Sequence, residues 1–322
     1  MNLKWIAGFL ISFGIVLAAM PSFIEYLKKL SFKQSVSEYA LEDDKKKAGT
    51  PIMGGVLFIV VPIIVALLLS FQEFSHMDTW IVILAFAGYG LIGFVDDYLI
   101  AVKKNNDGLT PIQKFSMQLV LGAVFFLLYQ GSSTQLAIAL PFVKEPVNLG
   151  WGYFILVLLM FAGSSNAINL TDGMDGLASG VSIIALIPYV VICILQKRTG
   201  LVVFLFGLLG ALLGYLYFNK KPARVFMGDT GSLALGGVLA GLAMITKTEL
   251  LLVIIAGVPV IETLCVLIQQ ISVRTGHGKV FVYTPIHYAF RIKGMPEVNI
   301  VRMFWLVESI FACLGLMIYL LY

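Results

Sequence analysis

The chain has 322 residues, of which 59% are hydrophobic and 12% are charged, with a formal net charge of +4 and a mean hydropathy of +0.95. This composition is too apolar for a water-soluble domain and fits an integral membrane protein. It excludes a soluble enzyme whose surface is covered by water.

Apolar stretches follow one another along the whole chain, and each is long enough to cross a bilayer as a helix of roughly 17–25 residues. The ten stretches begin near Trp5, Ile52, Trp80, Phe115, Leu149, Ala178, Gly200, Leu233, Leu250 and Met303. We find no soluble domain, low-complexity tail or clear internal repeat. We therefore predict an all-α, polytopic membrane protein with about ten transmembrane helices, in a single domain over residues 1–322.

Lysine and arginine residues divide unevenly between the connections on the two sides. Seventeen of the 22 lie in the connections at 24–51, 96–114, 219–230 and 273–302. Because positively charged connections stay in the cytoplasm, this side is predicted to be cytoplasmic and both termini extracytoplasmic. The same connections are long and rich in Gly, Asn and Asp, so function is expected to face the cytoplasm.

The three cysteines are Cys193, Cys265 and Cys313, and all of them lie in apolar runs without metal-ligand spacing. We interpret them as buried free thiols and not as a disulfide or metal site.

The first polar feature is KKKAGTPIMGG, from Lys45 to Gly55. A basic cluster with glycines before a helix start suits an anionic ligand. Taken alone, however, lysines beside a membrane span more often only set its topology.

The second feature is the pair Asp96 and Asp97 at the end of the third apolar stretch. Acids at a helix C-terminus oppose the helix dipole, which favours a functional role over a solvated helix end. Adjacent helical side chains point about 100° apart, so the pair cannot easily chelate one ion together. We expect one carboxylate to hold a cation and the other to accept a proton.

The third feature is NAINLTDGMDG, from Asn166 to Gly176, which lies between two apolar runs. Asp172 and Asp175 would share a face if helical, although their neighbouring glycines favour a loop or a helix start. Groups this polar must sit at a membrane surface or line a polar cavity. Because one helix cap needs fewer such residues, we interpret the stretch as the floor of an active site.

The fourth feature is NKKPARVFMGDTGS, from Asn219 to Ser232. Asp229 is on its face an ordinary N-cap of the next helix. With basic residues and an exposed Phe226 beside it, the segment equally suits a nucleotide site, where the ring stacks on a base and the carboxylate binds a hard cation such as Mg²⁺.

The fifth feature is the long connection from His277 to Gly294. The alternation from Val280 to Thr284 hints at a short strand, and His287 follows Pro285. A lone loop histidine is more often structural than catalytic.

Together these features bring acids, lysines and one histidine to one side of a membrane protein, which is what phosphoryl transfer with a hard cation requires. The sequence has no Walker loop, HExxH or GxSxG motif, so P-loop hydrolysis, zinc proteolysis and serine esterase chemistry are unsupported. We predict phosphotransfer to a lipid.

Several motifs, in the same order, resemble the phospho-N-acetylmuramoyl-pentapeptide transferases of bacterial wall synthesis, from about Lys45 to Glu297. They are KAGTPIMGG, GFVDDYL, LTPIQK, NAINLTDGMDGLASG, PARVFMGDTGSLALGG and PVIETLCVLIQ. The resemblance implies ten transmembrane helices, a homodimer and Mg²⁺. It also implies transfer of phospho-MurNAc-pentapeptide from its UDP carrier to undecaprenyl phosphate, giving lipid I and UMP at the cytoplasmic face of the bacterial plasma membrane.

The resemblance also implies roles for single residues. It implies that Asp229 binds Mg²⁺ and that Asp96 either deprotonates the lipid phosphate or attacks as a nucleophile. It also implies that Asp97 is an essential neighbour of Asp96 and that His287 is a further catalytic residue. Substrate contacts are implied for Lys47, Thr50 and Lys114 on the phosphate side, for Asn169, Asp172, Asp175, Gly176, Asn219 and Phe226 around the nucleoside, and for Gln269 near the sugar. A bend at Pro259 in the ninth span, with an apolar groove beside it for the prenyl chain, is also expected.

Two departures from the family pattern stand out. The family commonly has three consecutive histidines where this chain has His287, Tyr288 and Ala289, and Ile52 replaces a threonine of the GTPTMGG motif. The altered histidine run keeps open a transferase acting on UDP-GlcNAc or a similar donor. A third interpretation is an ion-coupled transporter, since Glu262 and Glu308 fall within spans.

Overall fold

The computed structural model describes residues 3–30, 49–103, 108–132, 136–143 and 145–321. Its helices are α1 (Leu3–Lys29), α3 (Gly55–Ser70), α4 (Met77–Lys103), α5 (Pro111–Ser132), α6 (Gly152–Thr171), α7 (Leu177–Leu195), α8 (Thr199–Asn219), α9 (Gly228–Thr246), α10 (Glu249–Ile255), α11 (Gly257–Arg274), α12 (Ile286–Ile292) and α13 (Glu297–Leu321), with a 3₁₀ helix η1 at Phe71–Ser75. Two short strands, β1 (Ala137–Ile138) and β2 (Val147–Asn148), pair antiparallel.

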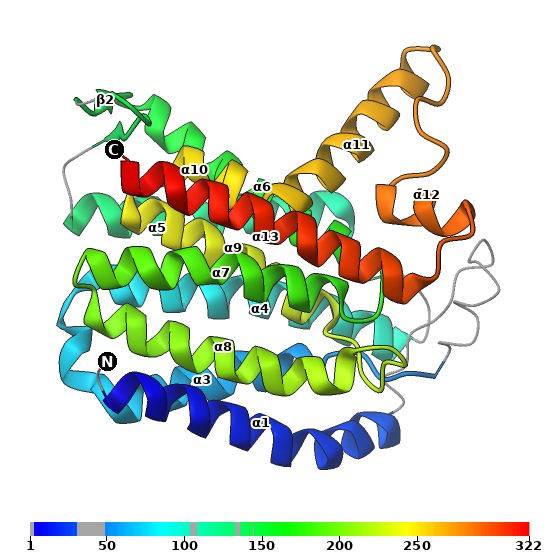
Figure 1. Cartoon of the computed structure of the whole chain (residues 1–322), viewed down its shortest axis with the longest axis horizontal. Coiled ribbons are helices and arrows are strands. Elements are labelled where there is room, and N and C mark those ends of the chain that lie inside the picture. The colour runs from blue at the N-terminus through cyan, green and yellow to red at the C-terminus, as the bar shows by residue number, and fades with distance from the viewer. Residues whose placement is uncertain (1–2, 31–48, 104–107, 133–135, 144, 322) are drawn as a thin grey trace.

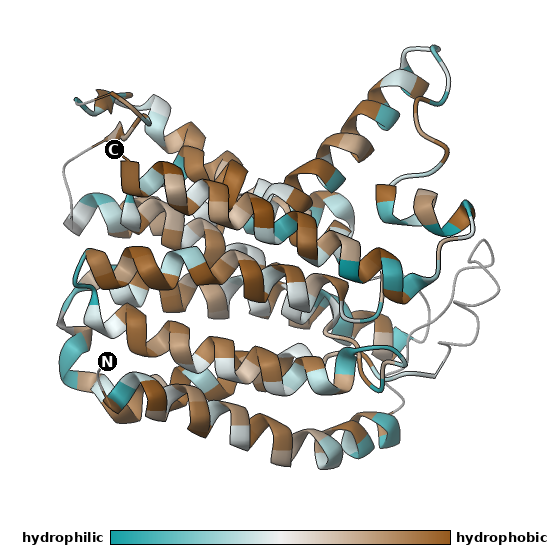
Figure 2. Ribbon diagram, in the orientation of Figure 1, coloured by the Kyte–Doolittle hydropathy of each residue, from teal (hydrophilic) through white to brown (hydrophobic). Residues whose placement is uncertain are grey.

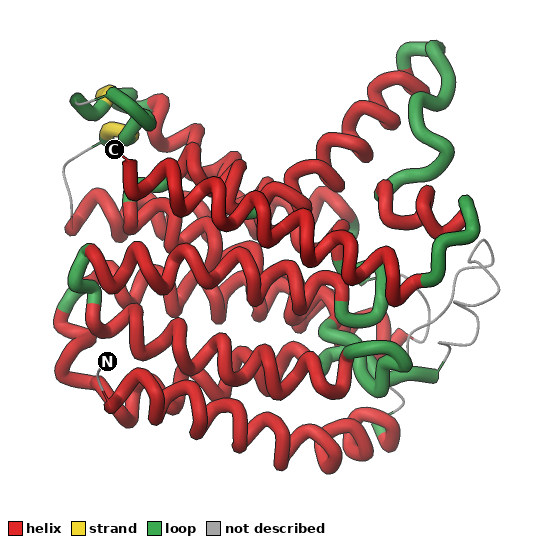
Figure 3. The backbone as a smooth tube through the Cα atoms, in the orientation of Figure 1, coloured by secondary structure: helices red, strands yellow, loops and turns green. Residues whose placement is uncertain are grey.

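Within the described residues, ten helices are long and apolar enough to cross a membrane, which confirms the predicted ten-span helical fold. Helices suit hydrocarbon because they satisfy their backbone N–H and C=O groups internally. Hydrophobic residues, drawn in brown, predominate along the helices in Figure 2. Helices dominate the chain trace, and both termini lie at one end of the bundle, opposite the loop that joins α8 to α9 (Figures 1 and 3).

The helix boundaries differ from the sequence-based expectation in places. The last span begins at Glu297 and not near Met303, because the polar first turn of α13 is helical as well. The segment Val280–Thr284 forms bends and no strand, so the predicted short strand is wrong. Among the described residues no strand lies beside this segment to pair with it, and α12 follows directly.

The ninth span is interrupted, but not at Pro259. The break lies at Ala256 (φ −106°, ψ 47°), between α10 and α11. Pro259 falls in the first turn of α11, where its missing N–H costs no intrahelical hydrogen bond. In Figure 1, α11 leaves the bundle from this break and projects outward.

The cysteines are free, as expected, but they are not all buried. Cys193 and Cys265 are buried, whereas Cys313 is exposed on α13. Only 22% of the apolar window of α13 is buried, so this helix lies at the edge of the bundle and a cysteine on it need not face the protein.

Helix α9 lies at the centre of the bundle. In its apolar window 89% of the residues are buried, against 22% for α1, and it packs against α3, α4 and α6. Glycines allow the closest of these contacts. A Cβ atom on Gly93 of α4 would collide with the backbone of Asp229, and one on Gly237 of α9 would collide with Tyr89 of α4. Small residues at helix contacts are typical of membrane bundles, and here they bring the start of α9 against α4.

We predict that Gly93→Ala destabilises the protein, because the added methyl group forces α4 and α9 apart. Overpacking of this kind costs about 1–3 kcal/mol, so the thermal unfolding temperature in detergent should fall. Gly14→Ala is the matched control, since a Cβ there has no atom within 4 Å. Equal unfolding temperatures for the two variants would contradict the close α4–α9 contact.

Candidate active site

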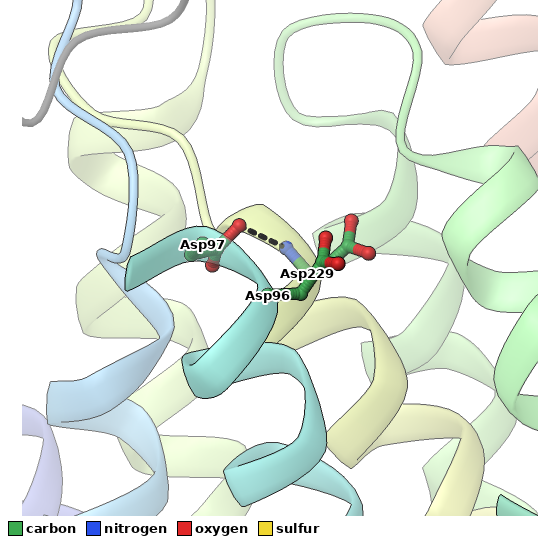
Figure 4. A group of neighbouring side chains, drawn as sticks. All are labelled: Asp96, Asp97 and Asp229. Carbon is green, nitrogen blue, oxygen red and sulfur yellow. Dashed lines mark hydrogen bonds between the residues drawn. The ribbon is translucent and has the colours of Figure 1, made fainter. Parts of the chain in front are cut away.

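Three aspartates from two helices meet at one end of the bundle (Figure 4). Asp96 and Asp97 belong to α4, and Asp229 lies in the first turn of α9. One carboxylate oxygen of each lies within 4.8 Å of the others. Asp96 and Asp97 are only 4% and 3% exposed, and α4 continues beyond them to Lys103. They are therefore not a solvated helix end.

Asp97 holds the N-terminus of α9. Its carboxylate accepts hydrogen bonds from the backbone N–H of Asp229 (3.1 Å) and from the N–H and hydroxyl of Thr230 (3.0 and 2.6 Å). The first N–H groups of a helix have no intrahelical partner, and a negative charge there is favourable to the helix dipole. The helix has no side-chain cap of its own, because its N-cap residue is Met227, whose side chain offers these N–H groups no oxygen acceptor. The reading of Asp229 as an N-cap is therefore wrong, and Asp97 satisfies these N–H groups from the neighbouring helix.

Asp96 faces the other side of the cluster. It accepts hydrogen bonds from the backbone N–H of Leu109 (2.7 Å) and from Lys114 Nζ (3.0 Å). The ammonium group of Lys114 also forms an ion pair with Asp229. In Figure 4 the carboxyl groups of Asp96 and Asp229 lie side by side, while that of Asp97 turns toward the Asp229 backbone.

Asn169 attaches the end of α6 to the same cluster. Its side-chain amide donates hydrogen bonds to Asp229 Oδ1 (2.7 Å) and to Ser232 Oγ (2.9 Å). The Asp229 carboxylate is held by Asn169 of α6 on one side and by Lys114 of α5 on the other, so two neighbouring helices fix its orientation.

Asp172 and Asp175 of NAINLTDGMDG lie in the turn after α6. Helix α6 ends at Thr171, so Asp172 and Asp175 do not share a helix face. Asp175 is buried, and its carboxylate accepts a hydrogen bond from the backbone N–H of Ala223 (3.0 Å). Gly176 takes a positive φ of 80° and leads into α7. The turn is thus attached to the loop after α8.

The loop after α8 also contacts the segment around Thr50. The N–H of Phe226 donates to Pro51 O (2.9 Å), and the N–H of Gly54 donates to Phe226 O (2.8 Å). The Phe226 side chain is half-buried and not fully exposed as expected. Thr50, also half-buried, precedes this pairing, and Lys47 lies outside the described residues.

Asn219 and Gln269 make their contacts within the protein. Asn219 is 1% exposed, accepts a hydrogen bond from Ser179 Oγ (2.7 Å) and donates one to Val225 O (3.0 Å). The Gln269 amide binds the backbone of Val280 and Phe281, and so attaches that loop to α11. Both side chains shape loops of the site.

His287 is fully buried at the start of α12, where its Nδ1 lies 2.9 Å from Glu262 Oε1 of α11. Ile52 is also buried, at 7% exposed.

The aspartate cluster suits a hard divalent cation. Such ions prefer carboxylate oxygens, and three are within reach of one another here. Among the described residues around it, Lys114 is the cation paired with the cluster, so the site keeps negative charge. That Asp96 and Asp97 cannot easily chelate one ion together stays a prediction, and the structure adds the Asp229 carboxylate as a third oxygen donor beside them.

Three residues whose hydrogen bonds hold the site together were not predicted from the sequence in these roles. Thr230 binds Asp97, Glu262 binds His287, and Glu297 accepts from the N–H of Asp175 (2.9 Å) while pairing with Lys221. A signal existed for Glu297, since Pro296-Glu297 is typical of a helix start. Nothing in the sequence indicates the partner of Glu262.

We predict that the protein binds Mn²⁺, used as a spectroscopic substitute for a hard divalent cation, and that Asp229→Asn weakens this binding strongly because the cluster loses an anionic ligand. Electron paramagnetic resonance of free Mn²⁺ measures the effect. Asp78→Asn is the matched control, since Asp78 lies at the opposite end of α4 and pairs with Arg198. Equal Mn²⁺ binding by both variants would exclude the cluster as the cation site.

Comparison with known proteins agrees with this geometry. Residues 79–247, which carry all three aspartates, match the family model for glycosyl transferase family 4. The chain is 45% identical over 310 residues to the phospho-N-acetylmuramoyl-pentapeptide-transferases of Bacillus thuringiensis (strain Al Hakam) and Bacillus cereus (strain AH187), covering 96% of this chain and 95% of each relative. The chain therefore belongs to the phospho-N-acetylmuramoyl-pentapeptide-transferase family.

Proposed function

We propose that this protein transfers phospho-MurNAc-pentapeptide from UDP-MurNAc-pentapeptide to undecaprenyl phosphate, forming lipid I and UMP in bacterial peptidoglycan synthesis. The observation that carries the proposal is the meeting of Asp96, Asp97 and Asp229 at one end of a ten-helix bundle, in a chain similar to named transferases over nearly its full length.

The donor set fits Mg²⁺ as the cation. Asp229 would hold it, with the other two carboxylates beside it, and the ion would supply charge neutralisation at the diphosphate of the donor. Lys114, paired with both Asp96 and Asp229, adds a fixed positive charge at the same place.

Asp96 is the proposed base. It takes the proton of the lipid phosphate, whose oxygen then forms a bond to the phosphorus next to the sugar. The bond from that phosphorus to the bridging oxygen breaks, and UMP leaves. A base must be positioned before its proton affinity matters, and Asp96 is held by Leu109 and Lys114. Asp97 supports the same step by keeping Asp229 in place.

The turn from Asp172 to Gly176 and the loop from Asn219 to Phe226 are proposed to surround the nucleoside. The hydrogen bond between Asp175 and Ala223 joins the two segments and supports this proposal. The half-buried ring of Phe226 offers a stacking surface for uracil. Lys47 and Thr50 are proposed on the phosphate side, Gln269 near the sugar and His287 among the catalytic residues.

The site is proposed to face the cytoplasm, with both termini extracytoplasmic and the chain a homodimer. Both termini lie opposite the α8–α9 loop (Figure 1), and the basic connections favour a cytoplasmic position for that loop.

We predict that alkaline phosphatase fused to the C-terminus is active in Escherichia coli, because this enzyme matures only outside the cytoplasm. The same fusion placed after Lys220 should be inactive. The reverse pattern would place the aspartate cluster on the outer face of the membrane.

We predict that Asp96→Asn lowers the rate of UMP release by about 10²–10⁴-fold, the usual contribution of a general base. Mg²⁺-dependent release from UDP-MurNAc-pentapeptide with undecaprenyl phosphate is the measurement, and Asp78→Asn should keep its activity. Near-normal release by Asp96→Asn would remove this residue from the mechanism.

Changing the sugar-nucleotide donor in the same UMP-release assay tests the alternative transferase function. UDP-GlcNAc should give no UMP, and its use in preference to UDP-MurNAc-pentapeptide would contradict the proposed substrate. A transporter has no structural support from Glu262 and Glu308, because both carboxylates accept hydrogen bonds from the starts of helices.

A further inference from the structure

Glu262 is a buried carboxylate whose hydrogen-bond partners are the first residues of α12. Its Oε2 accepts from the N–H of Ile286 (2.7 Å), and its Oε1 accepts from the N–H of His287 (3.2 Å). The same Oε1 lies 2.9 Å from His287 Nδ1. Both side chains are 0% exposed. A charge so deeply buried is tolerated only when it is well hydrogen-bonded.

These contacts determine which ring nitrogen of His287 carries a proton. Both oxygens of Glu262 already accept backbone N–H groups, so the carboxyl group acts as an acceptor. The contact to Nδ1 is then an N–H donated by the imidazole, because a hydrogen bond at one ring nitrogen sets the tautomer of the other. Nε2 is left as the nitrogen that can accept a hydrogen bond, and this buried atom has no partner among the described residues.

Nε2 lies against the turn that follows α6. A Cβ atom on Gly173 would collide with His287 Nε2, so the imidazole edge rests directly on the backbone of this residue. Tyr288 secures the contact from the other side, since its hydroxyl donates to Gly173 O (3.1 Å). Its ring also packs on that of His287, with centroids 4.3 Å apart.

We propose that Glu262 is a positioning residue that keeps His287 protonated on Nδ1, so that Nε2 contacts the sugar nucleotide held at the Asp172–Gly176 turn. Tyr288 and Gly173 hold the ring at the correct distance from that turn. The proposal rests on the proposed function for the identity of the ligand, but the state of the histidine ring can be measured without turnover.

The chain has three histidines, His76, His277 and His287, so ¹⁵N-histidine spectra of the full protein in nanodiscs can be assigned by replacing the other two. His287 is expected to carry its proton on Nδ1. Glu262→Gln should produce a second population protonated on Nε2. Glu308→Gln removes another buried carboxylate, one that accepts from the N–H of Val258 (2.9 Å), and should leave the tautomer unchanged.

Adding UDP-MurNAc-pentapeptide without lipid acceptor should shift the Nε2 resonance in the wild type. Gly173→Ala should abolish this shift, because its methyl group displaces the ring. Gly163→Ala should preserve the shift, since a Cβ there has no atom within 4 Å. In UMP release, Glu262→Gln should lower kcat by about 10–100-fold, as loss of a partner that orients a functional histidine does at metal sites.

Any of three results would overturn the inference. The wild-type His287 imidazole could lack a proton on Nδ1, its tautomer could be unchanged in Glu262→Gln, or its Nε2 resonance could fail to shift when UDP-MurNAc-pentapeptide is added. Absent UMP release with a nucleotide-dependent Nε2 shift would contradict the proposed reaction and leave the inference intact. Normal UMP release without a nucleotide-dependent Nε2 shift would overturn the inference and leave the proposed reaction intact. If Glu262→Gln does not fold, the wild-type tautomer and the Gly173→Ala comparison decide.

Discussion

The site depends on one contact between two helices, the carboxylate of Asp97 against the N-terminus of α9. It satisfies backbone N–H groups of Asp229 and Thr230 that α9 cannot satisfy itself. It also fixes where α9 starts relative to α4. Since Asp96 precedes Asp97 on α4 and Asp229 lies in the first turn of α9, the same contact brings these two carboxylates side by side (Figure 4).

The cluster concentrates negative charge in a bundle whose buried residues are mostly apolar. Neighbouring carboxylates repel one another, and burial increases the cost. Lys114 offsets part of this charge, and the backbone of α9 offsets another part through Asp97. A divalent cation would offset the rest. The glycine-mediated packing of α4 on α9 keeps the arrangement rigid, so the charge is held in place before any substrate binds.

The sequence predicted the ten helices because apolar runs of this length have few alternatives in a membrane, and it predicted the polar segments because their residues do not fit hydrocarbon. It could not predict which side chains form hydrogen bonds from one helix to another. Asp229 matched the pattern of an N-cap, yet the cap comes from Asp97 on another helix. Glu262 lies within a span, and its sequence position does not indicate that it binds the start of α12. The alternation at 280–284 predicted a strand, but a strand needs a neighbouring strand, and none lies beside this segment in the described part of the chain.

The most direct test of the account is anomalous diffraction from crystals of the protein soaked with Mn²⁺. The account predicts one anomalous peak in contact with Asp229 and within the group formed by Asp96, Asp97 and Asp229. A peak bound elsewhere in a protein that still releases UMP, or catalysis with no ion at these carboxylates, would contradict it.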